Sequence, residues 1–161
     1  MASTIQVSSR SQLHVAPLVF AADLDYIGDV RASTQVLVSF VIVFHLVVFV
    51  VEAFLWMQPR VHEAVLHRLS TSAVPAGEQA LILRSVLINQ GFYNLFLATA
   101  AFSGLRFVRS GHETVGRALV VYACLTALAA GIVLASTTTA YIGACLQSLP
   151  AALVLVTIRK T

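Results

Sequence analysis

The chain has 161 residues, of which 58% are hydrophobic and only 11% are charged, with a formal net charge of +3. Soluble domains carry about 25% charged residues, so this composition excludes an ordinary soluble domain and indicates a membrane protein. The basic residues are placed between apolar stretches, which indicates membrane topology rather than a nucleic-acid partner.

Residues 1–34 are predicted to form an arm outside the membrane domain. The segment starts polar, becomes apolar from Leu13, contains Pro17, and turns acidic at Asp23. A secretory signal needs an uninterrupted apolar core and a small-residue cleavage site, and Pro17 and His14 interrupt the core. We therefore favour an uncleaved arm that lies in the cytoplasm, along the membrane surface or across a partner.

Residues 35–161 are predicted to form one all-α domain, a four-helix transmembrane bundle with a short interfacial helix. Each apolar stretch is close to the ~20 residues that cross ~30 Å of hydrocarbon. The four predicted spans are Gln35–Met57, Ala80–Phe102, Arg117–Ala135 and Thr138–Ile158.

The basic residues predict that both termini are cytoplasmic. Seven of them flank the ends that would share the side of the termini: Arg10, Arg31, Arg106, Arg109, Arg117, Arg159 and Lys160. Only Arg60, Arg68 and Arg84 lie toward the other side. Since cytoplasmic loops carry an excess of Lys and Arg, the expected location is the bacterial cytoplasmic (inner) membrane, crossed several times.

The connections between spans have distinct patterns. Val61–Leu69 has an apolar stripe and predicts an amphipathic helix at the membrane interface. Ser103 and Gly104 are predicted to end the second span, and the short segment at 136–139 predicts an antiparallel hairpin of spans three and four. Pro150 is expected to kink the fourth span.

Neither histidines nor cysteines predict a metal or cofactor. His62 and His67 are five residues apart, which turns them ~140° from each other on a helix and prevents a shared metal. Cys124 and Cys145 lie within spans and are expected to be free thiols.

Polar side chains inside the spans are the candidate functional residues, because hydrocarbon leaves them without hydrogen-bond partners. The most concentrated group lies at 89–94, within the second span. The candidate ligand-binding residues are His45, Glu52, Trp56, Arg84, Asn89, Gln90, Tyr93, Asn94 and Gln147.

We estimate the depth of these residues from the predicted outer ends of the spans, using a rise of ~1.5 Å per residue. Their similar depths predict one cluster in the outer half of the bundle. His45 and Glu52 are seven residues apart and share a helix face. Glu52 and Arg84 have matching depths, which predicts an ion pair between them. Amides in bundles also act as interhelical hydrogen-bonding groups, so structural and ligand-binding roles both remain open, and Gly91 and Gly104 are expected to be packing residues.

Three motifs carry a resemblance to a known family. They are His45-x6-Glu52-x-Phe54-Leu55-Trp56-x2-Pro59-Arg60, Asn89-Gln90-Gly91-x-Tyr93-Asn94-x2-Leu97-Ala98 and Gln147-x2-Pro150-Ala151. Together they resemble domain-of-unknown-function family thirteen-oh-four, small bacterial integral membrane proteins with four predicted helices. The resemblance covers about Val41 to Val156 and implies no activity. Phe44 and Ala53 depart from the acidic residue and the methionine expected at those positions.

Three functions are compatible with this sequence. The first is a non-catalytic protein that binds membrane lipids or a small amphipathic molecule, or is an accessory subunit of a larger complex. The second is an enzyme acting on a lipid or isoprenoid, with Glu52 and His45 as acid and base. The third is a transporter or proton path, which would require a homo-oligomer because four helices without an internal repeat are few.

Overall fold

The computed structural model describes residues 32–69 and 73–158, and every regular element in these ranges is helical. The elements are α1 (Ala32–Val50), a π-helical turn η1 (Val51–Leu55), α2 (Pro59–Leu69), α3 (Ala76–Arg109), α4 (Glu113–Thr137) and α5 (Tyr141–Thr157). The predicted arm lies almost wholly outside the described residues, although α1 already begins at Ala32.

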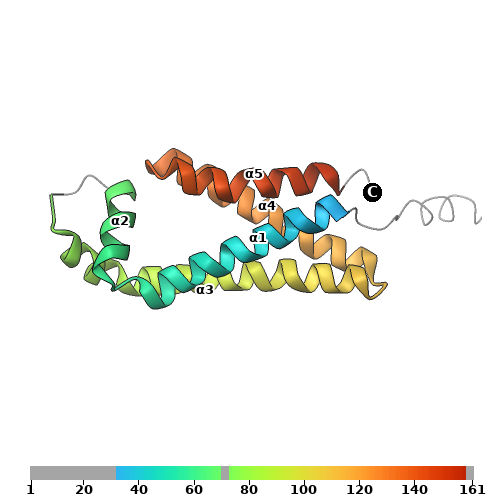
Figure 1. Ribbon diagram of the computed structural model, residues 1–161, viewed down its shortest axis with the longest axis horizontal. Helices are drawn as coiled ribbons and strands as arrows, with labels where there is room; N and C mark the ends of the chain where they lie inside the picture. Colours follow the sequence, from blue (N-terminus) through green and yellow to red (C-terminus); the bar gives the residue numbers. More distant parts are fainter. Residues whose placement is uncertain (1–31, 70–72, 159–161) are drawn as a thin grey trace, which may run out of the picture.

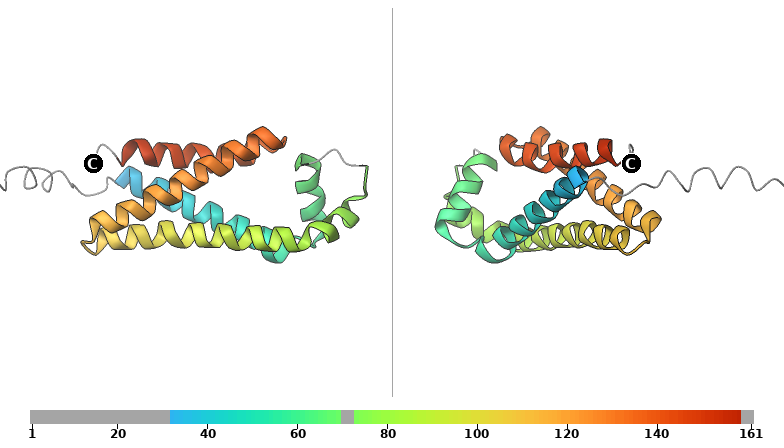
Figure 2. Two further views of the ribbon diagram at one scale, coloured as in Figure 1. Left: turned by 180° about the vertical axis from the view of Figure 1, so that it is seen from behind. Right: turned by 45° about the vertical axis from the view of Figure 1, so that its right-hand side comes forward.

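The molecule is elongated, with α3 along its full length (Figure 1). Helices α3 and α4 pack against each other, α4 packs against α5, and α1 contacts both α3 and α5. Both views of Figure 2 show α1 crossing diagonally from its start beside α5 to its end beside α3. The predicted hairpin of the last two helices is therefore confirmed.

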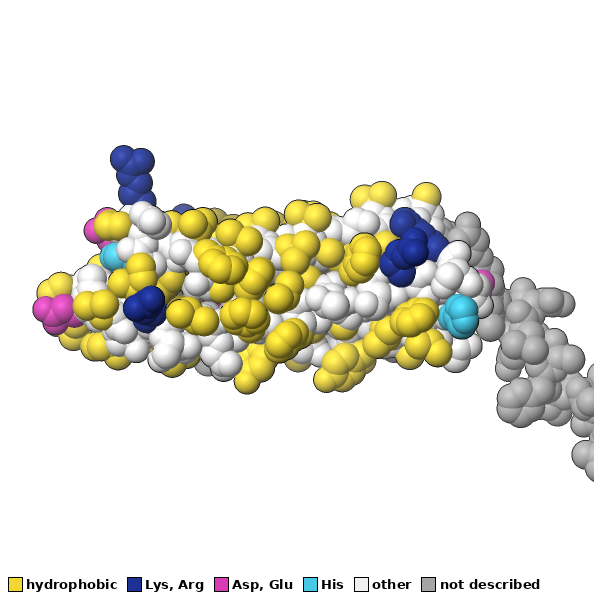
Figure 3. All heavy atoms as spheres, turned by 90° about the horizontal axis from the view of Figure 1, so that it is seen from below, with side chains coloured by type: hydrophobic (Ala, Val, Ile, Leu, Met, Phe, Trp, Pro, Cys, Tyr) yellow, Lys and Arg dark blue, Asp and Glu magenta, His cyan; other side chains and the backbone are white. Residues whose placement is uncertain are grey.

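Within residues 32–69 and 73–158, three helical segments are long and apolar enough to cross a membrane: Ala32–Leu55, Ala76–Arg109 and Glu113–Thr137. The fourth predicted span is the apolar helix α5, which has 17 residues and continues through Pro150. The chain thus has the composition and helix lengths of a membrane protein. Figure 3 shows one face on which hydrophobic side chains cover the middle and charged or histidine side chains lie at the two ends.

Helix α3 has 34 residues and exceeds its predicted span at both ends. Ser103 and Gly104 do not end it, so that prediction is wrong. Gly111, at φ 83°, ends it instead, with the His112 amide donating to the Phe107 carbonyl at 2.9 Å. A glycine in the left-handed region at this position forms the Schellman ending.

Gly104 serves the contact between α3 and α4. A Cβ atom at Gly104 would lie 2.8 Å from the carbonyl oxygen of Gly116, and one at Gly116 would lie 2.6 Å from the carbonyl oxygen of Gly104. Two backbones meet here without side chains between them, which is the packing that small residues allow in membranes. The predicted packing role of Gly104 is confirmed.

The core has two parts. The larger part fills the centre of the four long helices with small and β-branched side chains, among them Val38, Ala101, Ala127 and Val154. The smaller part consists of Trp56, Leu66 and Ala80, with partly buried neighbours from α2 and α3. The second part fixes α2 against the first turns of α3.

The two ends of the described chain lie at the same end of the molecule (Figure 1). Arg109 donates to the side-chain oxygen of Gln35 at 3.0 Å, and Arg117 donates to the backbone carbonyl of Ile158. A guanidinium at the C-terminus of α5 also stabilises the negative end of the helix dipole. Helix α2 and the α4–α5 turn lie at the opposite end.

Candidate functional site

The π-helical turn η1 lies against Gly91 of α3. A Cβ atom at Gly91 would be 3.1 Å from the backbone nitrogen of Ala53, 3.2 Å from the Cβ of Glu52 and 3.2 Å from the carbonyl oxygen of Phe49. The absence of a side chain at Gly91 lets the backbone of η1 approach α3. The predicted packing role of Gly91 is confirmed, and single π turns within α-helices are frequent at functional sites.

This close approach brings the carboxylate of Glu52 to the amide of Asn94. The Nδ2 atom of Asn94 donates to Oε2 of Glu52 at 3.0 Å and to the backbone carbonyl of Gln90 at 3.1 Å. Both amide hydrogens are therefore used, and both partners are acceptors, which fixes the orientation of the amide group. Asn94 is 9% exposed and Glu52 is half-buried.

Aromatic residues next to Glu52 and Asn94 in the chain contact one another. The ring centroids of Phe49 and Phe92 are 5.3 Å apart, as are those of Phe49 and Phe54, and both pairs meet edge to face. Phe92 also contacts Phe96. The segments that carry Glu52 and Asn94 thus also carry an apolar, aromatic surface that includes the exposed Phe54 and Phe92.

His45 lies two helical turns before Glu52 and is 1% exposed. Its Nδ1 atom is 2.8 Å from the carbonyl oxygen of Val41. A carbonyl only accepts, so Nδ1 carries the hydrogen and Nε2 is the second, open position. Nε2 is buried and has no hydrogen-bond partner among the described residues. No described hydrogen bond joins His45 to Glu52, and each is held by a different group.

The predicted ion pair between Glu52 and Arg84 is wrong, because the carboxylate bonds to Asn94, ten residues further along α3. The depth estimate treated Met57 and Ala80 as level ends of neighbouring spans. In the structure α3 begins at Ala76, and its first turns extend beyond α1 to pack against α2. Arg84 lies in this extension and is exposed.

The other predicted site residues are distributed over separate surroundings. The side chains of Asn89, Gln90 and Tyr93 are exposed on α3, and Gln147 on α5 is half-buried. Trp56 is 2% exposed and its indole nitrogen donates to the carbonyl of Ala80 at 2.9 Å, so it belongs to the smaller core. Of the nine candidates, all of which are described, only Glu52 and Asn94 are joined by a hydrogen bond between two side chains.

Two features were missed in the sequence. His62 is 5% exposed, with Nδ1 3.2 Å from the carbonyl of Trp56, and its burial was not predicted from the sequence. A cavity also lies between α2 and the start of α5, where Thr139 donates to the carbonyl of Arg68. The only sequence signal for the cavity was Arg68 at the end of an amphipathic helix.

Metal and disulfide chemistry find no support in the described ranges. No group of three or more His, Cys, Asp or Glu side chains within residues 32–69 and 73–158 is placed to hold a metal ion. Cys124 is buried, Cys145 is exposed and both are free, as expected.

Comparison with known proteins places the chain in a family. Residues 39–158 match the family described as "Protein of unknown function (DUF1304)". The chain belongs to this family. The matched segment contains the stretch from Val41 to Val156 that carries the resemblance in the sequence, and with it Glu52 and Asn94. No curated protein and no solved structure matches the chain.

Proposed function

We propose that this member of the DUF1304 family is a non-catalytic, multi-pass membrane protein that binds a small amphipathic molecule at Glu52 and Asn94. The observation that carries the proposal is the half-buried carboxylate of Glu52, held by Asn94 in a π-helical turn of a membrane-length segment. Placing an ionisable side chain within a membrane-spanning segment costs free energy. Such residues are therefore rare there and usually have a function.

The hydrogen bonds indicate the chemistry of the ligand. Asn94 uses both of its amide hydrogens, and Glu52 already accepts one of them through Oε2. The remaining hydrogen-bonding positions of the pair are acceptors, namely the carboxylate oxygens of Glu52 and the Oδ1 atom of Asn94. A complementary head group therefore supplies donors, as a hydroxyl or an amine does, while Phe49, Phe54 and Phe92 contact an apolar body.

The proposed location is the bacterial cytoplasmic membrane, with both termini in the cytoplasm. The support is the clustering of Arg106, Arg109 and Arg117 at the end of the molecule that holds both described chain ends, because positive charge is retained on the cytoplasmic side. Helix α5 would then be the fourth span. Its 17 residues rise ~26 Å, which suits a thinner or locally adapted bilayer.

The test is the variant Glu52→Gln, which keeps an oxygen that accepts from Asn94 but removes the charge. The protein is purified in a mild detergent, its small molecules are extracted and analysed by mass spectrometry, and its thermal unfolding is recorded by circular dichroism. We expect the bound molecule to be lost while the melting temperature stays close to that of the wild type. Glu63→Gln, an exposed carboxylate on α2, is the matched control and should retain the molecule. Retention by Glu52→Gln, with a lower melting temperature alone, would leave Glu52 a structural residue and refute the proposal.

A second candidate function is that of a subunit, either in a larger membrane complex or in a homo-oligomer. The observation that favours it is the exposure of Asn89, Gln90 and Tyr93 near the middle of α3. Polar side chains at this position need partners that lipid cannot supply. Native mass spectrometry of the wild type and Asn89→Leu tests this, since loss of association in the variant supports it and a monomeric wild type contradicts it.

A further inference from the structure

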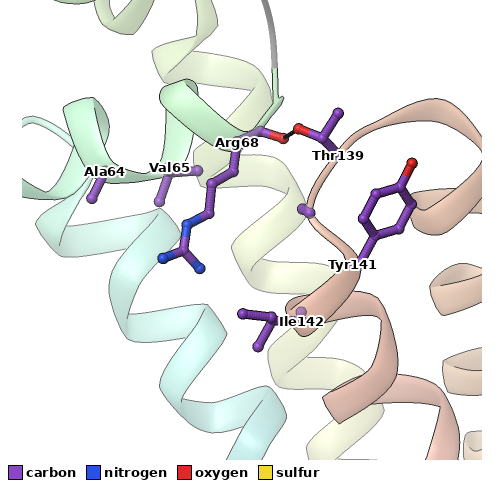
Figure 4. A pocket seen from close by; sticks show the side chains of 8 residues that line it. Ala64, Val65, Arg68, Thr139, Tyr141 and Ile142 are labelled. Atoms are coloured by element: carbon purple, nitrogen blue, oxygen red, sulfur yellow. Dashed lines mark hydrogen bonds between the residues drawn. The ribbon is translucent and has the colours of Figure 1, made fainter.

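A second binding region lies at the end of the molecule opposite the described chain ends. A cavity of about 630 Å³ lies between the last turns of α2 and the start of α5. Its labelled lining residues in Figure 4 are Ala64, Val65, Arg68, Thr139, Tyr141 and Ile142. The volume falls within the range of ligand sites, ~300–1,000 Å³. It is separate from Glu52 and Asn94, which do not line it.

The two walls of the cavity are linked by a hydrogen bond. The hydroxyl of Thr139 donates to the backbone carbonyl of Arg68 at 2.6 Å, which fixes the end of α2 beside the α4–α5 turn. The side chain of Arg68 extends away from this bond into the space between α2 and Ile142 (Figure 4). The bond uses only the backbone of Arg68, so the guanidinium is not needed to hold the walls together.

The electrostatic character of the cavity is positive. Among the described residues that line it, Arg68 is the one charged side chain and none is acidic. The first turn of α5 also contributes, because the N-cap residue Ala140, just before the helix, provides no side-chain cap and the amides of the first turn point outward from the helix start. Arg68 carries the argument, since a guanidinium offers paired donors that match two oxygens of a phosphate.

The apolar part of the lining has the character of a membrane interface. Ala64, Val65 and Ile142 provide hydrophobic surface beside the guanidinium. Tyr141 is 60% exposed, and tyrosine is enriched at the level of lipid head groups. The cavity thus combines a guanidinium, which can bind a phosphate, with an apolar surface that suits the first part of an acyl chain.

We propose that this cavity binds the phosphate head group of an anionic membrane phospholipid, with Arg68 donating to the phosphate oxygens and Val65 and Ile142 contacting the glycerol and acyl region. The lipid is the favoured source of the phosphate because the apolar walls would have no counterpart on inorganic phosphate. Binding here does not depend on the Glu52 site, and either can fail without the other.

The experiment measures lipid affinity of the full chain in detergent by thermal unfolding while phosphatidylglycerol is added, with phosphatidylcholine and inorganic phosphate as separate arms. We expect stabilisation by phosphatidylglycerol, and an apparent affinity at least about tenfold weaker in Arg68→Gln, since a hydrogen bond to a charged group contributes on that scale. Arg60→Gln removes the same charge from an exposed position of α2 outside the cavity and should behave as the wild type.

A second variant tests the space in the cavity independently of the charge of Arg68. Ala64 is exposed at the cavity, so Ala64→Trp should fill the space and weaken phosphatidylglycerol binding with Arg68 intact. If Arg68→Gln and Arg60→Gln lost the same affinity for phosphatidylglycerol, the lipid would be attracted by the surface charge in general, and the proposed site would be wrong. Stabilisation by inorganic phosphate to the same extent would overturn the lipid assignment, and equal stabilisation by phosphatidylcholine would overturn the role of charge.

Discussion

The contact between Gly104 and Gly116 predicts that a single methyl group destabilises the bundle. In Gly104→Ala the new Cβ atom would lie 2.8 Å from the Gly116 carbonyl oxygen, 2.8 Å from Cγ2 of Val120 and 3.0 Å from the backbone nitrogen of Val120. Ordinary contacts of this kind begin near 3.4 Å. Two of the three atoms belong to the backbone of α4, so they cannot move by a change of rotamer and the helices must separate.

The expected cost follows from two opposing effects. Overpacking a close contact costs about 1–3 kcal/mol, and a rigid backbone neighbour favours the upper part of that range. Replacing Gly by Ala inside a helix returns about 1 kcal/mol. We therefore expect a net loss of about 2 kcal/mol in the free energy of unfolding, which is roughly a 30-fold change in the unfolding equilibrium constant.

Reversible unfolding in mixed micelles by titration with dodecyl sulfate, followed by circular dichroism, measures this difference. Gly77→Ala is the matched control, because Gly77 lies in the first turns of the same helix and a Cβ atom there would meet nothing within 4 Å. The control should be unchanged or up to about 1 kcal/mol more stable. Adding Val120→Ala to Gly104→Ala should not restore stability, because the Gly116 carbonyl remains. Equal stability of the Gly104→Ala and Gly77→Ala proteins would refute the reasoning.

Three further predictions concern other parts of the fold. Arg117→Ala should lower the free energy of unfolding by about 1 kcal/mol, because the hydrogen bond from Arg117 to the Ile158 carbonyl is lost, and dodecyl sulfate titration against an Arg106→Ala control checks this. Fluorescence of Trp56, the single tryptophan, should be emitted at short wavelength and be quenched little by iodide, because the indole is 2% exposed; strong quenching would contradict the described packing of α2. Cysteines introduced at Ser110 and Thr138 in a background without native cysteines should react with an impermeant thiol reagent from opposite sides of the membrane, and labelling from one side would contradict the proposed topology.

The sequence predicted the helices well because hydropathy and the ~20-residue membrane length limit the alternatives. It predicted the boundaries less well, and α3 illustrates the reason. A glycine can end a helix or permit a close crossing, and sequence alone does not distinguish the two uses. Gly104 has the second role, because Gly116 lies opposite it, and Gly111 has the first, because the chain reverses there with a positive φ.

Glu52 and Asn94 were both among the candidates named from the sequence, but the hydrogen bond between them was not predicted. Glu52 and Asn94 stand out because carboxylates and amides are rare in spans. Which of several polar residues on α3 meets Glu52 depends on the relative position of the helices along their axes. That position is set by Gly91, which admits the backbone of η1, and by α2, which packs against the first turns of α3. Neither contact produces a periodic signal in the sequence.

The π-helical turn also separates the two regions for which binding is proposed. In a regular α-helix Glu52 and Trp56 would share a face. A turn with one extra residue rotates the next part of the helix by about 100°. The carboxylate accordingly faces Asn94, whereas the indole reaches Ala80 in the smaller core with α2. That core positions α2 and hence Arg68, so η1 allows one helix to supply both the polar pair inside the apolar region and the support for the cavity at its end.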